Sequence, residues 1–221
     1  MARQTVVPSF KPPSEWSTAQ VLNLLVKVSL LGLLLFAVLN PDMQQFEGKA
    51  MTGRALTYPI AVIIVPIGWY LLHRSRPHLE YPHVLDMLLG LPFLIDTLGN
   101  ALDMYDSITW WDDVNHFVNW AILAAAFGQL LLRFDYGRWT MAALMIGFGS
   151  VSGVTWEIAE YFTFVRGGPE EGTAYTDTLG DLALDLGGAV VAAVVIAWLL
   201  NPHVREQAGI AGNSGSSFPQ P

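Results

Sequence analysis

The chain has 221 residues, of which 52% are hydrophobic and 14% charged, whereas ordinary soluble domains carry roughly 25% charged residues. This composition predicts an integral membrane protein. The net charge of −8, with only 11 Lys and Arg, argues against nucleic-acid binding, and the absence of cysteine excludes disulfides and thiolate metal sites.

Six stretches come close to the roughly 20 apolar residues that a helix needs to cross a bilayer. They lie at about 20–39, 55–72, 84–104, 113–133, 139–164 and 176–200. We therefore predict an all-α fold, a polytopic membrane helix bundle with about six transmembrane helices in residues 20–200. Residues 1–19 are expected to form a cytoplasmic tail, and the low-complexity residues 201–221 a disordered cytoplasmic tail.

The positive charges of the loops and tails indicate an orientation. Seven Lys and Arg fall on the side of the two termini, and three fall on the other side: Lys49, Arg54 and Arg166. Because positively charged loops prefer the cytoplasm, both termini are expected to be cytoplasmic, in a plasma (bacterial inner) membrane.

With that orientation, four consecutive predicted helices carry acids in their outer halves. Nine of the 19 acids lie there: Asp96, Asp103, Asp112, Asp113, Glu157, Glu160, Asp177, Asp181 and Asp185. Helical spacing places them on stripes, with Asn100 beside Asp96 and His116 one turn after Asp112. The two glutamates continue a row of small residues, Gly149 and Gly153, which lets a neighbouring helix approach closely. Gly180, Gly187 and Gly188 are expected to do the same on the last helix, and Asp86 is interpreted as a helix cap.

An ionised carboxylate at membrane depth costs about 2.5 to 3.5 kcal/mol on insertion scales, so these side chains should face the interior of the bundle. Like charges that meet there need cations among them, or protonation, to relieve their repulsion. Carboxylates together with an imidazole are what a divalent ion such as Zn, Mn, Mg or Fe accepts. The pattern therefore predicts a site for a divalent metal ion.

We assign roles within that site as hypotheses. Glu157, Asp181, Asp185 and His116 are the expected metal ligands, and His116 and Glu160 are the expected catalytic groups, as general base and proton shuttle. Supporting positions are assigned to Asp96, Asn100, Asp103, Asp112, Asp113, Asp177 and Tyr161.

Three motifs carry a resemblance to a known family. They are "DDVNHF", with Asp112 and His116; "WEIAEY", with Glu157 and Glu160; and "DTLGDLALDLGGA", with Asp177, Asp181 and Asp185. From about residue 60 to 200 the chain resembles the YjdF-like bacterial inner-membrane proteins, and the first 55 residues lie outside the resemblance. The resemblance implies a polytopic membrane fold and no established activity.

The preferred hypothesis is a metal-dependent hydrolase or transferase that acts on a lipid-like, amphiphilic substrate from an outward-facing site. A cation or proton-coupled transporter, in which protonatable carboxylates bind and release a cation, is the alternative. A carrier should also have acids or an aqueous path that continues to the cytoplasmic side, and the inner halves of the last two helices offer only apolar and small residues. A subunit of a larger membrane complex, whose acids meet a basic partner, is a third interpretation.

Overall fold

The computed structural model describes residues 16–168 and 171–201, and within them the chain is helical with no strand. The long helices are α1 (Thr18–Leu39), α3 (Pro59–His73), α4 (His83–Ala101), α6 (Trp111–Leu131), α7 (Arg138–Glu160) and α8 (Ala174–Val194). The short ones are η2 (Gln44–Phe46), α2 (Met51–Thr57), α5 (Met104–Ser107) and the π-helical segments η3 (Tyr161–Val165) and η4 (Val195–Leu200). The predicted all-α fold is confirmed.

Among the residues that the structure describes, six helical segments are long and apolar enough to cross a membrane, which confirms the predicted number. They are Thr18–Leu39, Met51–His73, His83–Ala101, Trp111–Leu131, Arg138–Thr163 and Ala174–Leu200. The second consists of α2 and α3. Pro59 is the first residue of α3, where the backbone N–H of a helix has no partner, so the missing N–H of proline costs no hydrogen bond. Large side chains such as Leu35, 60% exposed, cover the outside of the bundle, as expected for a surface that faces lipid.

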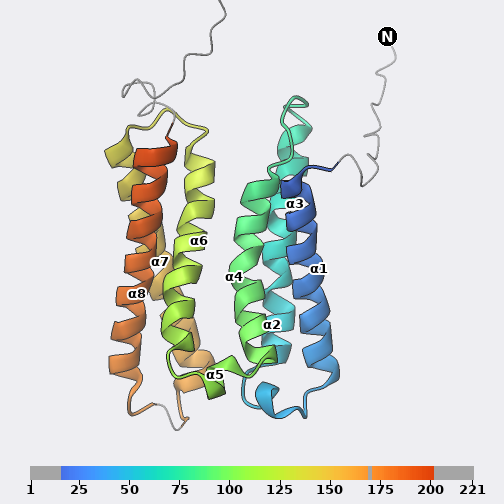
Figure 1. Cartoon of the computed structure of the whole chain (residues 1–221), viewed down its shortest axis with the longest axis vertical. Helices are drawn as coiled ribbons and strands as arrows, with labels where there is room; N and C mark the ends of the chain where they lie inside the picture. The colour runs from blue at the N-terminus through green and yellow to red at the C-terminus, as the bar shows by residue number, and fades with distance from the viewer. Residues whose placement is uncertain (1–15, 169–170, 202–221) are drawn as a thin grey trace, which may run out of the picture.

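The helices form two groups that meet along α4 and α6 (Figure 1). In one group α1 packs against α4 and α2 with α3 lies beside them, and in the other α8 packs against α6 and α7. The short helix α5 connects the groups at one end of the bundle, whereas the start of α1 and the end of η4 lie at the opposite end. The carboxyl ends of α4 and α7 and the amino ends of α6 and α8 are therefore on the α5 side.

Small residues bring α8 close to its neighbours. A Cβ atom at Gly188 would overlap the backbone carbonyl of Phe117 on α6, and one at Gly149 of α7 would overlap the Ala189 side chain. The predicted close approach at Gly149 is therefore confirmed. Gly180 does not take part, since a Cβ there would meet nothing within 4 Å.

The interpretation of Asp86 as a helix cap is wrong, because its side chain is 0% exposed and points at α1. Its Oδ2 atom lies 2.6 Å from Lys27 Nζ, and it accepts hydrogen bonds from Asn23, at 2.7 Å, and from the Tyr81 hydroxyl. Lys27 also donates to the Val62 carbonyl at 2.9 Å. Burial and the bond to Asp86 raise the pKa of Tyr81, so its hydroxyl stays a donor at neutral pH.

The two predicted tails fall almost entirely outside the described residues. Of the first 19 residues, the structure describes Trp16 onward, and Ser17 caps α1. The Ser17 hydroxyl accepts from the Gln20 backbone N–H while the Gln20 side chain accepts from the Ser17 N–H, so the two form a capping box. The first helix therefore begins at Thr18.

Candidate functional site

His116 on α6 is the centre of a carboxylate cluster to which three helices contribute. Its Nδ1 atom lies 2.9 Å from Asp185 Oδ1 on α8 and 3.8 Å from Glu157 Oε1 on α7. Its Nε2 atom lies 3.8 Å from Asp181 Oδ1 on α8 and 3.9 Å from Asp112 Oδ1, one turn earlier on α6. The structure thus brings the glutamates of α7 and the aspartates of α8 to one imidazole.

The orientation of the His116 ring is fixed from two sides. Nδ1 donates its proton to Asp185, since a carboxylate can only accept in this bond. The ring also stacks on Trp120, with 5.5 Å between ring centroids and 12° between the planes. In the neutral imidazole this arrangement leaves the electron pair of Nε2 directed toward Asp112 and Asp181.

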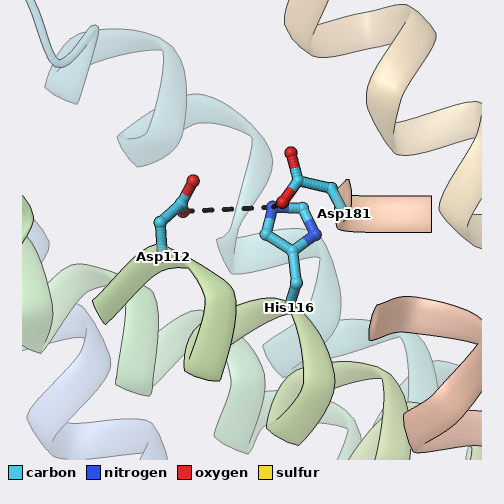
Figure 2. Close-up of side chains that lie close together, drawn as sticks. All are labelled: Asp112, His116 and Asp181. Atoms are coloured by element: carbon cyan, nitrogen blue, oxygen red, sulfur yellow. Dashed lines mark ion pairs between the residues drawn. The ribbon is translucent and has the colours of Figure 1, made fainter. Parts of the chain in front are cut away.

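Two groups of side chains in the cluster have ligand atoms close enough to share an ion. The atoms of Asp112, His116 and Asp181 all lie within 4.8 Å of one another, and so do those of His116, Glu157 and Glu160. Figure 2 shows the first group, in which both carboxylates approach the imidazole of His116. His116 belongs to both groups and therefore links them.

Two carboxylate oxygens in the cluster are buried without a hydrogen-bond partner among the described residues. They are Oε1 of Glu157, whose residue is 7% exposed, and Oδ2 of Asp185, whose residue is 1% exposed. A buried oxygen in this state is costly, by roughly 1 to 3 kcal/mol. A cation or a proton at these oxygens would remove that cost.

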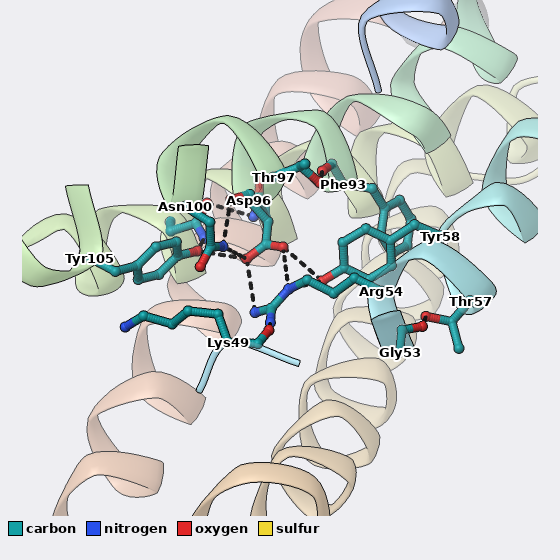
Figure 3. A network of polar contacts seen from close by, with 12 residues as sticks. Lys49, Gly53, Arg54, Thr57, Tyr58, Phe93, Asp96, Thr97, Asn100 and Tyr105 are labelled. Carbon is teal, nitrogen blue, oxygen red and sulfur yellow. Dashed lines mark hydrogen bonds and ion pairs between the residues drawn. The ribbon is translucent and has the colours of Figure 1, made fainter. Parts of the chain in front are cut away.

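Asp96 lies in a different network, between α4 and α2 (Figure 3). Its carboxylate accepts from Arg54 Nε at 3.0 Å, from the Tyr58 hydroxyl at 2.7 Å and from the Tyr105 hydroxyl at 2.8 Å. Asn100 donates to the Asp96 backbone carbonyl at 2.9 Å. Arg54 lies at the start of the second span and reaches across to Asp96, so this acid is balanced from within the protein and needs neither a foreign cation nor protonation.

A chain of hydrogen bonds connects this network to α6. The Asn119 amide donates to Asn115 Oδ1 at 2.7 Å, the Asn115 amide donates to the Tyr105 hydroxyl, and Tyr105 donates to Asp96. Burial, with the nearby Asp96 carboxylate, raises the pKa of Tyr105, so its hydroxyl stays protonated at neutral pH. Asn115 and Asn119 are thereby fixed on the same side of α6 as the network.

A cavity of about 440 Å³ lies between the His116 cluster and the Asp96 network. Its ionisable lining comes from both: Arg54, Asp96, Asp112, His116 and Glu160. Most of the remaining wall is aromatic or aliphatic and comes from α4, α6 and α7. A molecule in this cavity would contact a carboxylate and imidazole cluster at one side and an Arg–Asp pair at the other.

Four of the predicted supporting residues lie outside these contacts. Asp103 leaves the α4 stripe because the helix has already ended, and it adopts a positive φ of 58° at the start of α5. Asp113 and Asp177 are exposed. Tyr161 donates to Glu171 at 3.3 Å rather than to a glutamate of the cluster.

Several residues of the site were not predicted from the sequence, chiefly Arg54, Tyr58, Tyr105 and Asn115. The predicted second span begins at about residue 55, which puts Arg54 in the preceding loop, whereas the span in the structure begins at Met51. The amides Asn115 and Asn119 are spaced four residues apart on one helix face, and this spacing is a signal that could have identified the pair. Tyr58 follows Arg54 by four residues and accepts from its Nε at 3.1 Å, so this pair has the same spacing, whereas the contacts of Tyr58 and Tyr105 with Asp96 span 38 and nine residues and have no comparable signal.

Comparison with known proteins gives a family but no activity. Residues 22–202 match the family described as "Predicted membrane protein (DUF2238)". An uncharacterised protein of Thermotoga maritima is 29% identical over 164 residues, which is 66% of this chain and 85% of the relative. No solved structure matches. The match begins in the first helix, so the expectation that the first 55 residues lie outside the resemblance is wrong. The chain belongs to this family of predicted membrane proteins, which is the YjdF-like family that its motifs indicated.

Proposed function

We propose that the His116 cluster binds a divalent metal ion and that the protein is a metal-dependent hydrolase or transferase acting on an amphiphilic substrate. The observation that carries the proposal is the geometry of one imidazole. Asp185 accepts from Nδ1 at 2.9 Å, and Nε2 faces Asp112 and Asp181 at 3.9 and 3.8 Å. A carboxylate behind a histidine whose other nitrogen faces further acids is the arrangement typical of metal-ligating histidines.

This geometry refines the roles assigned from sequence. Asp185 would orient the imidazole and raise its basicity instead of holding the ion, while Nε2 of His116, Asp112 and Asp181 would be ligands. Glu157 and Glu160, which form the second group with His116, would complete the ligand set or carry protons. Imidazole with carboxylates suits Zn, Mn or Fe, and Mg would need more oxygens.

The cavity supplies the support for a reaction on an amphiphile. Glu160 and Asp112 belong to the cluster and also line the cavity, so a bound molecule would contact them directly. A metal ion bound there would polarise an ester or phosphoryl oxygen and lower the pKa of a bound water. Glu160 would accept and return the proton.

The site is proposed to open toward the outer face of a plasma membrane, with both termini in the cytoplasm. The support is the distribution of Lys and Arg. Two of the three cations on the α5 side are also paired locally, Lys49 with Asp106 at 2.7 Å and Arg54 with Asp96 at 3.0 Å. Labelling of single cysteines placed at positions 106 and 75 in intact cells tests the orientation, and labelling of position 75 alone from outside would contradict it.

Metal binding is tested by calorimetry and elemental analysis of detergent-purified protein. Wild type is expected to bind about one ion per chain, and Asp181→Asn, which removes a proposed ligand, is expected to bind far more weakly. The matched control is Asp113→Asn, which removes the same charge next to Asp112 from an exposed position. Negligible metal in the wild-type protein, or equal binding by both variants, would refute the metal site.

One observation favours a carrier as the second candidate. The structure contains a buried ion pair in the other half of the bundle, where Lys27 Nζ lies 2.6 Å from Asp86 Oδ2. The half of the bundle on the side of the termini therefore contains a buried acid, although the last two helices carry none there. Cation flux into proteoliposomes that is abolished by Glu157→Gln would support the carrier, and metal-dependent activity without flux would support the enzyme.

A further inference from the structure

The wall of the cavity is built largely from aromatic rings. Helices α4, α6 and α7, together with α5 and the residue that follows α2, contribute them: Tyr58, Phe93, Tyr105, Trp120, Phe148 and Trp156. Trp120 and Trp156 pack edge to face with ring centroids 6.2 Å apart, and Tyr58 packs on Phe93 at 4.8 Å. The negative faces of such rings attract cations, and quaternary ammonium groups are the ligands that aromatic cavities commonly bind.

The charges on the cavity wall also favour a cation as the ligand. Its acids are Asp96, Asp112 and Glu160, and its permanent cation among the described residues is Arg54. Arg54 is held by Asp96, with Nε 3.0 Å and Nη2 3.5 Å from the two carboxylate oxygens, so the pair adds little net charge. Asp112 and Glu160 therefore make the wall negative. A single divalent ion in the cluster would leave negative charge on the five carboxylates around His116 if these are ionised.

Two buried polar atoms on the same wall have no hydrogen-bond partner among the described residues. They are Oδ1 of Asn119 and Nε1 of Trp120, and both residues are 6% exposed. Buried polar groups are rarely left unpaired, and these two belong to residues that line the cavity. A volume of about 440 Å³ is within the range of small-molecule sites.

Two residues of the cavity wall are also exposed on the outside of the bundle. Val151 of α7 lines the cavity and is 69% exposed, and Thr155, one turn later, lines it and is exposed as well. Both lie within the fifth membrane span. An alkyl chain could therefore extend from the cavity into the bilayer while the head group stays beside Asp112 and Glu160.

We propose that the cavity binds an amphiphile whose head group is a quaternary ammonium or similar organic cation. The proposal deepens the proposed function, on which it rests, by naming the class of substrate. Aromatic rings surround the cation, Asp112 and Glu160 balance it, and the chain leaves past Val151.

The experiment uses the quenching of tryptophan fluorescence in the full-length protein in an uncharged maltoside detergent. The probes are dodecyltrimethylammonium, its neutral isostere with carbon in place of nitrogen, and dodecyl phosphate. Wild type is expected to bind the cation at least about tenfold more tightly than the other two, which corresponds to about 1.4 kcal/mol. Equal affinity for the cation and the neutral isostere, or tighter binding of the phosphate, would overturn the proposal without any variant.

Variants then locate the binding. Glu160→Gln and Trp156→Leu are each expected to weaken binding of the cation by about fivefold or more, and Asp113→Asn is expected to leave it unchanged. If Glu160→Gln and Asp113→Asn had equal effects, the cation would be attracted to negative charge on the protein surface instead of being bound in the cavity, and the proposal would be overturned. Each titration is repeated with EDTA. Cation binding in EDTA together with no metal uptake refutes the metal site alone, and metal uptake without preference for the cation refutes this proposal alone.

Discussion

Substituting Gly188 by alanine tests whether the contact between α6 and α8 holds the site together. A Cβ atom there would overlap the Phe117 carbonyl oxygen and lie 2.9 Å from the Ala121 backbone nitrogen. Both are backbone atoms of α6, so a side-chain rotation cannot relieve the overlap. Ordinary contacts of this kind are about 3.5 Å or longer, and α8 must therefore move away from α6 by roughly 1 Å or more.

That movement has two measurable consequences. Overpacking of a helix seam costs about 1 to 3 kcal/mol, and alanine normally gains about 0.5 to 1 kcal/mol over glycine in a helix, so the net destabilisation is about 1 kcal/mol at the centre of these ranges. The bond from His116 to Asp185 crosses the same seam at 2.9 Å, and a displacement of that size would stretch it toward or beyond the limit of a hydrogen bond. Both stability and metal affinity should fall.

The assay is thermal unfolding in detergent, together with calorimetric metal titration of Gly188→Ala beside Gly180→Ala. Gly180 is the matched control because it lies on the same helix and a Cβ there meets nothing within 4 Å. The control should unfold at the same temperature as wild type or slightly higher, with unchanged metal affinity. If Gly188→Ala were as stable as Gly180→Ala, the seam would not be close-packed and the reasoning would be refuted.

Three further predictions follow from the contacts. Asp185→Asn should keep about one bound ion but weaken it about 10- to 100-fold by calorimetry, because it disturbs the partner of His116 and removes no proposed ligand; unchanged affinity would contradict the role of Asp185. Lys27→Met should lower the unfolding free energy by about 3 to 5 kcal/mol in chemical denaturation, because Asp86 stays buried without its cation; the double variant with Asp86→Leu should recover most of the loss, and no recovery would show that the pair is not the cause. Gly153→Ala should weaken metal binding with a smaller loss of stability than Gly188→Ala, because the new Cβ meets Asp185 Oδ2 at 2.6 Å, the end of a side chain; wild-type metal affinity would contradict this placement.

Sequence patterns predicted the helices well because their physical cause is local. A span in a bilayer must be long and apolar whatever its neighbours are, so six stretches were recognisable one at a time. The stripes also indicated which face of each helix turns inward, as at His116 and Asp181. The predicted position of Asp103 on the α4 stripe is wrong because it assumes that the helix continues to residue 103, whereas α4 ends at Ala101 and the chain turns.

Partners across the bundle could not be predicted in the same way. Asp86 and Asp96 both lie on α4 and are both buried, yet one is paired with Lys27 of α1 and the other with Arg54 of α2. Which cation reaches which acid depends on how the helices pack, and no single helix contains that information. The same packing puts a histidine, and no Lys or Arg within ion-pair distance among the described residues, beside the acids of α7 and α8.

The difference between these acids is the physical reason to look for a ligand at His116. Asp86 and Asp96 show that this chain supplies a cation to a buried carboxylate where the fold needs one. At the His116 cluster the fold instead converges four carboxylates on one imidazole, and leaves Glu157 Oε1 and Asp185 Oδ2 without a hydrogen-bond partner in the described part of the chain. Because an uncompensated buried charge is far more costly than a paired one, the arrangement is stable when a cation from outside the chain, or protons, occupies it.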